Sequence, residues 1–206
     1  MTYPQRVRDT ILPLSVAGNL PEAFEEWSFT ETIFDHEAPI ETCELCGKKE
    51  VRYHFQIENA LTEQRLWVGS HCILQFGVSV FEDDEKLTPA QAKKKLARLK
   101  DQMRLEFCLS ALQRLAAAEN NNILKGALGY YELNKCLTPK YGAVVLWRLK
   151  ANKIDHSPTF FKITLKRSQH KEDLRNMKRS AFLNIWPALS ASQRKLAASF
   201  GHFPPC

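Results

Sequence analysis

Apolar and polar residues alternate along residues 51–58. The apolar positions are Val51, Tyr53, Phe55 and Ile57. A period of two is typical of a strand with one buried face. Polar residues 59–63 then predict a turn, and apolar positions within 65–68 predict a return strand. Gly69 ends that strand, and we expect Ser70 to cap a helix that follows it.

A helical period replaces this alternation after residue 88. Thr88 and Pro89 are the residue types of an N-cap and a first helical position. The apolar positions that follow are Leu96, Leu99, Met103, Phe107 and Leu112. Their spacing predicts a long amphipathic helix that ends by Ala118, before the three asparagines at 120–122.

The remaining chain predicts shorter helices. We expect Asn122 to cap a helix that ends near Asn134, and Thr138 with the proline after it to begin another. Two last helices are expected over 181–186 and 190–200. This part of the chain is therefore predicted to be mainly α-helical.

Three of the six cysteines flank the predicted hairpin. Cys43 and Cys46 form a Cys-x-x-Cys-Gly turn before it, and Cys72 lies on the helix after it. Gly47 supplies the positive φ angle that such a turn needs. Thiolates that converge in this order are typical of structural zinc sites, so we expect these three to bind Zn²⁺. Knuckle, hairpin and helix in this order resemble a treble-clef zinc finger.

The fourth zinc ligand is left open by the sequence. His71 adjoins Cys72, but its side chain would point about 100° away if both residues are helical. His54 lies on the first strand, on the face opposite the apolar positions. Another residue or a solvent ligand is the third alternative. We expect core or tail thiols at the other three cysteines, which are Cys108, Cys136 and Cys206.

The first 41 residues predict an arm that packs on the metal module. Asn19 can cap a short helix over 20–27. The whole chain therefore predicts an α+β fold. Residues 1–87 would form the arm and a small treble-clef-like zinc module, and residues 88–206 a basic, mainly helical domain.

Charge is divided unevenly along the chain, whose formal net charge is +6. Residues 1–92 carry 7 Lys and Arg against 16 Asp and Glu, a net charge of −9. Residues 93–206 carry 22 against 7, a net charge of +15. Such asymmetry indicates a polyanionic partner for the basic part. We expect the basic part to contact nucleic acid, and the acidic part to face a protein partner or the basic part itself.

Eleven basic residues are the candidates for contact with nucleic acid. They are Lys93, Lys94, Arg98, Arg148, Lys162, Lys166, Arg167, Lys171, Arg175, Lys178 and Arg179. Each cation that neutralises a phosphate releases counterions, so affinity should fall steeply with salt. Phe160 and Phe161 precede the most basic stretch. They are either core residues or rings on which bases stack.

Motifs of common enzyme classes are missing from the sequence. It has no Walker loop, no G-x-G-x-x-G, no H-E-x-x-H and no G-x-S-x-G. No carboxylate pair or Cys/His set stands out as catalytic, so we expect no enzymatic activity.

No apolar run approaches the ~18 residues of a membrane span, and the first residues lack the features of a signal peptide. We therefore expect a cytoplasmic protein, in which cysteines favour metal binding over disulfides.

Several short motifs resemble those of one group of proteins. The motifs are Glu26-Trp27, Cys43-Glu44-Leu45-Cys46-Gly47-Lys48, Ile57-Glu58-Asn59 and Trp67-Val68-Gly69-Ser70-His71-Cys72-Ile73. They are similar to motifs of small zinc-finger proteins of bacterial plasmids and phages. Among these, the chain most resembles the zinc-finger large subunit of type IV CRISPR effector complexes. The resemblance covers roughly residues 26–81, together with the chain length and the basic C-terminal half.

This resemblance implies a non-catalytic subunit of a crRNA-guided ribonucleoprotein that serves antiviral defence. Such a subunit would contact other protein subunits, the 5′ end of the crRNA and the PAM-side target duplex, and so bind RNA, DNA or both. The family motif carries over to Cys43, Cys46 and Cys72 as zinc ligands. Two alternatives stay open: a stand-alone zinc-finger DNA-binding protein of a plasmid or phage, and an inhibitor that binds host machinery through its acidic half.

Overall fold

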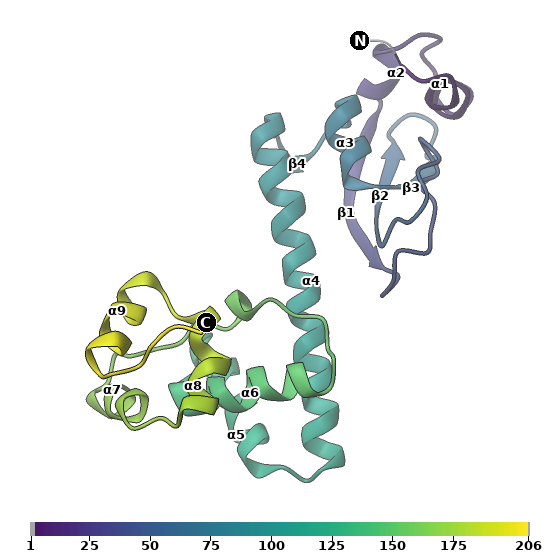
Figure 1. Ribbon diagram of the computed structural model, residues 1–206. Coiled ribbons are helices and arrows are strands. Elements are labelled where there is room, and N and C mark those ends of the chain that lie inside the picture. Colours follow the sequence, from purple (N-terminus) through teal and green to yellow (C-terminus); the bar gives the residue numbers. More distant parts are fainter. Residues whose placement is uncertain (1–2, 206) are drawn as a thin grey trace. The chain divides into compact units, whose positions relative to one another are not determined.

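The computed structural model describes residues 3–205, and the chain divides into two compact units (Figure 1). Unit 1 comprises Met1–Lys100 and unit 2 comprises Asp101–Cys206. Unit 1 contains a three-stranded sheet, whereas unit 2 is built from helices. This arrangement confirms the predicted α+β fold class.

Helix α4 (Pro89–Ala118) contributes to both units. The division between the units lies within this helix, C-terminal to the boundary expected after residue 87. The reason is that the first turns of α4 place Ala92 and Leu96 in the hydrophobic core of unit 1. Neither α4 nor another helix within residues 3–205 is long and apolar enough to cross a membrane.

Unit 1 is built on an antiparallel sheet with the strand order β1-β2-β3. Its strands are β1 (Trp27–Asp35), β2 (Tyr53–Asn59) and β3 (Arg65–Val68), and a separate hairpin joins β4 (Phe81–Glu82) to β5 (Glu85–Lys86). Its helical segments are α1 (Gln5–Ile11), α2 (Glu22–Glu25), α3 (Ser70–Phe76) and a 3-10 turn at Leu12–Leu14. The predicted order of knuckle, hairpin and helix is confirmed by β2, β3 and α3.

The β2–β3 hairpin faces the core as its sequence pattern predicts. Phe55 pairs with Val68, and Ile57 pairs with Leu66. All four side chains are buried. Because a slip of one residue would turn these side chains to the other face, their burial specifies the register of the hairpin.

Strand β1 is not predicted by the sequence pattern. Phe29 lies opposite Ile57 and Ile33 lies opposite Phe55, but the register shifts between the two pairs. Glu31, within this irregularity, has a φ angle of +66°. Four residues of β1 therefore span the length of two residues of β2. The polar residues 30–32 at this point interrupt the alternation by which strands are recognised.

Three helix starts differ from the expected ones. Helix α3 begins after Gly69, and Ser70 makes no side-chain cap. The side chain of Asn121, rather than Asn122, caps α5. Asn19 makes no cap to α2 and instead binds a glutamate side chain in its first turn. In each case another residue occupies the N-cap position, namely Gly69, Asn121 and Pro21.

Unit 2 packs short helices against the second part of α4. They are α5 (Asn122–Asn134), α6 (Pro139–Ala151), α7 (Ser168–Arg175), α8 (Arg179–Ile185) and α9 (Ala191–Ser199), with 3-10 turns at Pro158–Phe160 and Trp186–Ala188. The start of α6 at the Thr138 cap is confirmed. Gly142 lets α6 lie close to its neighbours, because a Cβ there would be 2.5 Å from Ile163 Cδ1 and 3.4 Å from Ile185 Cγ2.

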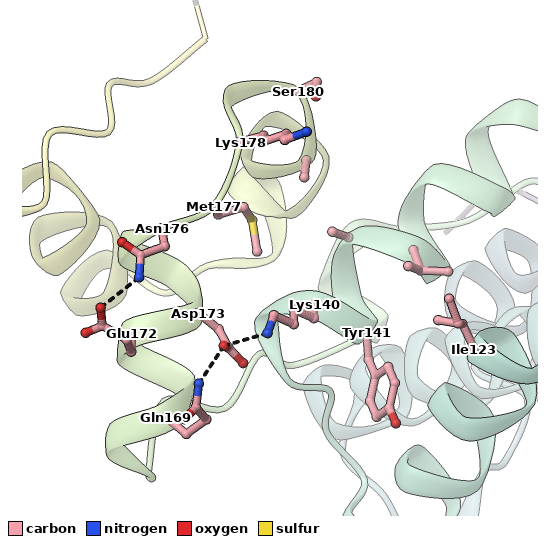
Figure 2. Close-up of a pocket in the computed structure, with 13 residues that line it drawn as sticks. Ile123, Lys140, Tyr141, Gln169, Glu172, Asp173, Asn176, Met177, Lys178 and Ser180 are labelled. Atoms are coloured by element: carbon pink, nitrogen blue, oxygen red, sulfur yellow. Dashed lines mark hydrogen bonds and ion pairs between the residues drawn. The ribbon is translucent and has the colours of Figure 1, made fainter.

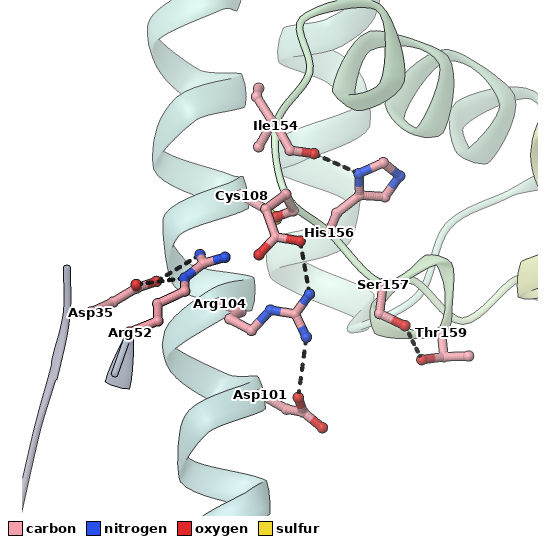
Figure 3. A network of polar contacts seen from close by, with 10 residues as sticks. Asp35, Arg52, Asp101, Arg104, Cys108, Ile154, His156, Ser157 and Thr159 are labelled. Atoms are coloured by element: carbon pink, nitrogen blue, oxygen red, sulfur yellow. Dashed lines mark hydrogen bonds and ion pairs between the residues drawn. The ribbon is translucent and has the colours of Figure 1, made fainter. Parts of the chain in front are cut away.

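Ion pairs connect successive segments within each unit (Figure 3). In unit 1, the Arg52 guanidinium donates two hydrogen bonds, of 2.8 and 3.0 Å, to the Asp35 carboxylate. In unit 2, Arg104 lies 2.9 Å from Asp155 and 3.7 Å from Asp101. The first pair joins the end of β1 to the start of β2, and the second joins α4 to the loop after α6.

Asn59, at the end of β2, is fully buried. Its Nδ2 donates hydrogen bonds to the Leu14 carbonyl at 3.1 Å and to the Glu26 carboxylate at 2.6 Å. Its Oδ1 accepts hydrogen bonds from the N–H groups of Leu61 and Thr62 at 2.8 and 3.0 Å. One side chain therefore connects the turn after β2 to the N-terminal arm, which packs on the module as expected.

We expect Asn59→Ala to lower the free energy of unfolding of unit 1 by about 3 kcal/mol, because it leaves several buried groups without hydrogen-bond partners. Urea unfolding followed by circular dichroism measures the change. Asn19→Ala is the control, since Asn19 is exposed and its loss should cost less than about 0.5 kcal/mol. Equal stability of the two variants would contradict this role of Asn59.

Candidate metal centre

The side chains of Cys43, Cys46 and Cys72 converge in unit 1. Their sulfur atoms all lie within 4.8 Å of one another. The Sγ of Cys72 is 3.6 Å from that of Cys43 and 3.2 Å from that of Cys46. Thiolates bound to one tetrahedral zinc ion lie about 3.8 Å apart, given Zn–S bonds of about 2.3 Å. This cysteine cluster (Cys43, Cys46 and Cys72) can therefore hold a metal ion, and its dimensions are compatible with zinc.

The loop that carries Cys43 and Cys46 folds as a tight knuckle. The Gly47 N–H donates to the Cys43 carbonyl at 2.8 Å, and the Cys43 N–H donates to the Lys48 carbonyl at 2.9 Å. Gly47 has the predicted positive φ angle, and a Cβ there would lie 2.6 Å from the guanidinium of Arg6. The positive φ angle favours glycine here, whereas the flexible Arg6 side chain could move aside for a Cβ.

Hydrogen bonds favour a negative charge on Cys43. Its sulfur lies next to the Cys72 thiol and accepts a hydrogen bond from the Gly69 N–H at 3.4 Å. The hydrogen bond from Cys72 lowers the pKa of Cys43 to about 5, against the opposing effect of burial. The same hydrogen bond, burial and the neighbouring sulfurs raise the pKa of Cys72. A bound cation would therefore displace the proton that Cys72 otherwise keeps.

Neither histidine offered by the sequence as a fourth ligand belongs to the cluster. Within residues 3–205, the three cysteines form the only group of His, Cys, Asp or Glu side chains with the spacing of a metal site. His71 is exposed on α3, and His54 is buried on β2. Cys206 lies outside the described residues. This geometry is compatible with the third alternative, another residue or a solvent ligand.

His54 belongs instead to a second polar cluster in unit 1. Its Nδ1 is 3.1 Å from Nε2 of His36, and Nδ1 of His36 is 4.0 Å from the Glu41 carboxylate. Burial, and next the nearby His36, lower the pKa of His54, so its ring is neutral at pH 7. The three side chains line a cavity of about 380 Å³ together with Trp67 and Glu44. No pattern within one segment indicates this cluster, because it depends on the pairing of β2 with the bulged strand β1.

The eleven basic residues predicted to contact nucleic acid divide between the two units. Lys93, Lys94 and Arg98 lie in unit 1, and the other eight lie in unit 2. Ten of the eleven are exposed, whereas Arg148 is half-buried and lies 2.5 Å from the Glu119 carboxylate. Within residues 3–205, six of those in unit 2 have no carboxylate partner. Arg179 donates instead to the backbone carbonyls of Phe203 and Pro204. The other five are Lys162, Lys166, Arg167, Lys171 and Lys178. These five are the cations most available to a polyanion.

The two phenylalanines before the basic stretch belong to the packing of unit 2. Phe161 is buried and meets the Tyr131 ring edge-on at 5.4 Å. Phe160 is half-buried, and the Arg104 guanidinium lies 5.3 Å from its ring centroid. Of the two alternatives for these rings, the structure favours the core role.

Comparisons of the chain with models of known protein families, with curated proteins and with solved structures find no match. The resemblance to the type IV CRISPR subunit therefore stays a prediction from sequence motifs. The cysteine cluster and the distribution of charge are the observations on which a function can be based.

We expect about one metal ion per chain, and we expect Cys72→Ser to lose it, because Cys72 lies close to both other sulfurs. The variant should also melt at a lower temperature, since metal-binding free energy contributes directly to the folding of such modules. Elemental analysis and thermal unfolding measure the two effects. Cys136→Ser removes a thiol of unit 2 and should keep the metal. Equal metal content in both variants would refute the site.

Proposed function

We propose that this protein is a non-catalytic, nucleic-acid-binding subunit of a crRNA-guided effector complex of the type IV CRISPR kind. It would contact the 5′ end of the crRNA, the PAM-side target duplex, or both, and would act in the cytoplasm. In RNA-guided complexes, base pairing reads the sequence, and the protein mainly contacts backbones and a short duplex. The observation that carries the proposal is a strongly basic helical unit linked to an acidic module whose three cysteines could hold a metal ion.

The charge of unit 2 supports binding to a polyanion. Residues 101–206 carry 17 Lys and Arg against 7 Asp and Glu. Five of the exposed cations lie within residues 162–178 and have no carboxylate partner in the described part of the chain. Positive charge that the chain itself does not neutralise attracts phosphates and raises the rate of association with them.

The burial of the cysteine cluster supports a structural zinc ion. Cys43 is 1% exposed and Cys72 is 3% exposed, and both belong to the core of unit 1, whereas Cys46 is half-buried at its edge. Structural zinc sites are closed, whereas catalytic sites keep an accessible position for water or substrate. We infer that Zn²⁺ stabilises unit 1 and takes no part in chemistry.

The acidic part of the chain is proposed to bind a protein subunit. Residues 1–92 carry a net charge of −9, which is unfavourable beside phosphates. A basic neighbour in a ribonucleoprotein complex would complement this charge. The two halves of the chain would then have different partners, one a protein and the other a nucleic acid.

We expect the triple variant Lys166→Ala, Arg167→Ala, Lys171→Ala to weaken binding to short RNA and duplex DNA. Each lost phosphate contact should reduce the slope of log affinity against log salt by about 0.7–0.9. Fluorescence anisotropy over a series of salt concentrations measures this slope.

A second triple variant, Arg114→Ala, Lys125→Ala, Lys195→Ala, is the matched control. It removes the same charge from exposed helical positions elsewhere in unit 2, and its slope should equal that of the wild type. The same loss in both variants would show that net charge, rather than this segment, governs binding.

Purification of the tagged chain together with its crRNA and neighbouring gene products tests the assembly. We expect stable partners and bound RNA. Sequence-specific DNA binding by the chain alone would favour the stand-alone regulator. Loss of partner binding only when acidic residues of unit 1 are reversed, without any affinity for nucleic acid, would favour the inhibitor.

A further inference from the structure

Trp147 presents its indole ring on the surface of unit 2. It lies on α6 and is 48% exposed. The guanidinium of Arg148 lies over the ring, with its Cζ 4.7 Å from the ring centroid. Glu119 holds that guanidinium through two contacts of 3.0 and 2.5 Å. Arg148, predicted to bind nucleic acid directly, therefore supports the indole instead, and an aromatic ring held in this way is suited to stacking.

The ring borders a groove between α6 and α8. A cavity of about 290 Å³ beside Trp147 is lined by Ala143, Val144, Ser180 and Ala181. The same four residues also border a larger cavity of about 690 Å³, which side chains from α7 complete (Figure 2). Small side chains therefore form the floor of a continuous groove, and one large aromatic ring stands at its wall. Its size is within the range of small-ligand sites, about 300–1,000 Å³.

The charged side chains that line the larger cavity are two lysines and two carboxylates, and most of them are engaged by neighbouring groups. Lys140 lies 2.9 Å from Asp173, and Gln169 donates to the same carboxylate at 2.9 Å. Although burial opposes ionisation, these hydrogen bonds lower the pKa of Asp173. Glu172 is engaged by two neighbouring side chains. Lys178, in contrast, is exposed at the groove and has no carboxylate partner within residues 3–205.

We propose that this groove binds an unpaired nucleobase, which stacks on Trp147 while an adjoining phosphate lies near Lys178. This inference rests on the proposed nucleic-acid binding and adds a site for single strands to it. Stacking on an aromatic ring tolerates every base, because each base has a flat face. The exposed apolar side chains of the groove are Trp147 beside the smaller cavity and Ile123 in the lining of the larger one. Binding of a protein segment to this surface is an outcome that the test below distinguishes.

The test compares Trp147→Ala with Trp147→Phe in the full chain. The probes are a single-stranded RNA, a single-stranded DNA and an abasic strand of equal length. We expect Trp147→Ala to weaken binding of both single strands about ten-fold, the effect of one lost base–aromatic stack. The salt slope should stay unchanged, because no phosphate contact is removed. Trp147→Phe should keep most of the affinity, and the abasic strand should bind all three proteins equally.

Leu183→Ala is the matched control, since Leu183 is an exposed apolar residue on α8 that lies outside both cavities. It should bind every probe as the wild type does. Thermal unfolding should show that every variant stays folded. We expect Trp147→Ala and Leu183→Ala to lower the melting temperature by similar small amounts, because both side chains are only partly buried.

Several outcomes would overturn the inference. If Trp147→Ala binds single strands normally while the wild type still binds nucleic acid, the groove is not a base site but the proposed function stands. An equal loss with the abasic strand would exclude stacking. If Trp147→Ala spares nucleic acid but prevents binding of a protein subunit, the groove is a protein site. A wild-type chain without affinity for any nucleic acid would refute the proposed function itself.

Discussion

The close approach of three sulfur atoms is the constraint on which unit 1 depends. Two come from one knuckle and the third from a helix that follows the hairpin, so the cluster joins segments that are distant in the chain. Sulfurs at 3.2 and 3.6 Å must share either protons or a cation. The pKa values of Cys43 and Cys72 move in opposite directions for this reason. A bound metal ion would resolve this competition and would tie helix α3 to the knuckle.

The second constraint is the separation of charge along the chain. Within residues 3–205, unit 2 keeps exposed cations without carboxylate partners, whereas much of the acidic charge lies before α4. A basic residue that forms an ion pair with a carboxylate is less available to a phosphate. Arg148 is held by Glu119 and lies over the ring of Trp147, so its guanidinium is engaged within the protein. Local ion pairing therefore decides which basic residues can meet a phosphate.

Features with a short sequence period were predictable. The hairpin of β2 and β3 follows from alternation, and the starts of α4 and α6 follow from a threonine before a proline. Strand β1 was not predictable, because the irregularity at Glu31 interrupts its alternation. The N-caps of α3 and α5 lie one residue before the predicted ones. Several polar residues stand near each helix start, and the backbone angles determine which residue is the N-cap.

The sequence by itself determined the fold class, the three convergent cysteines and the sign of charge in each half. These depend on spacing and composition, which are local or additive properties. Only the tertiary structure decided that His54 pairs with His36 outside the cysteine cluster, and that Trp147 stands exposed above a groove. Such facts depend on contacts between segments far apart in the chain. Strand pairing and helix packing create these contacts, and no periodicity within one segment encodes them.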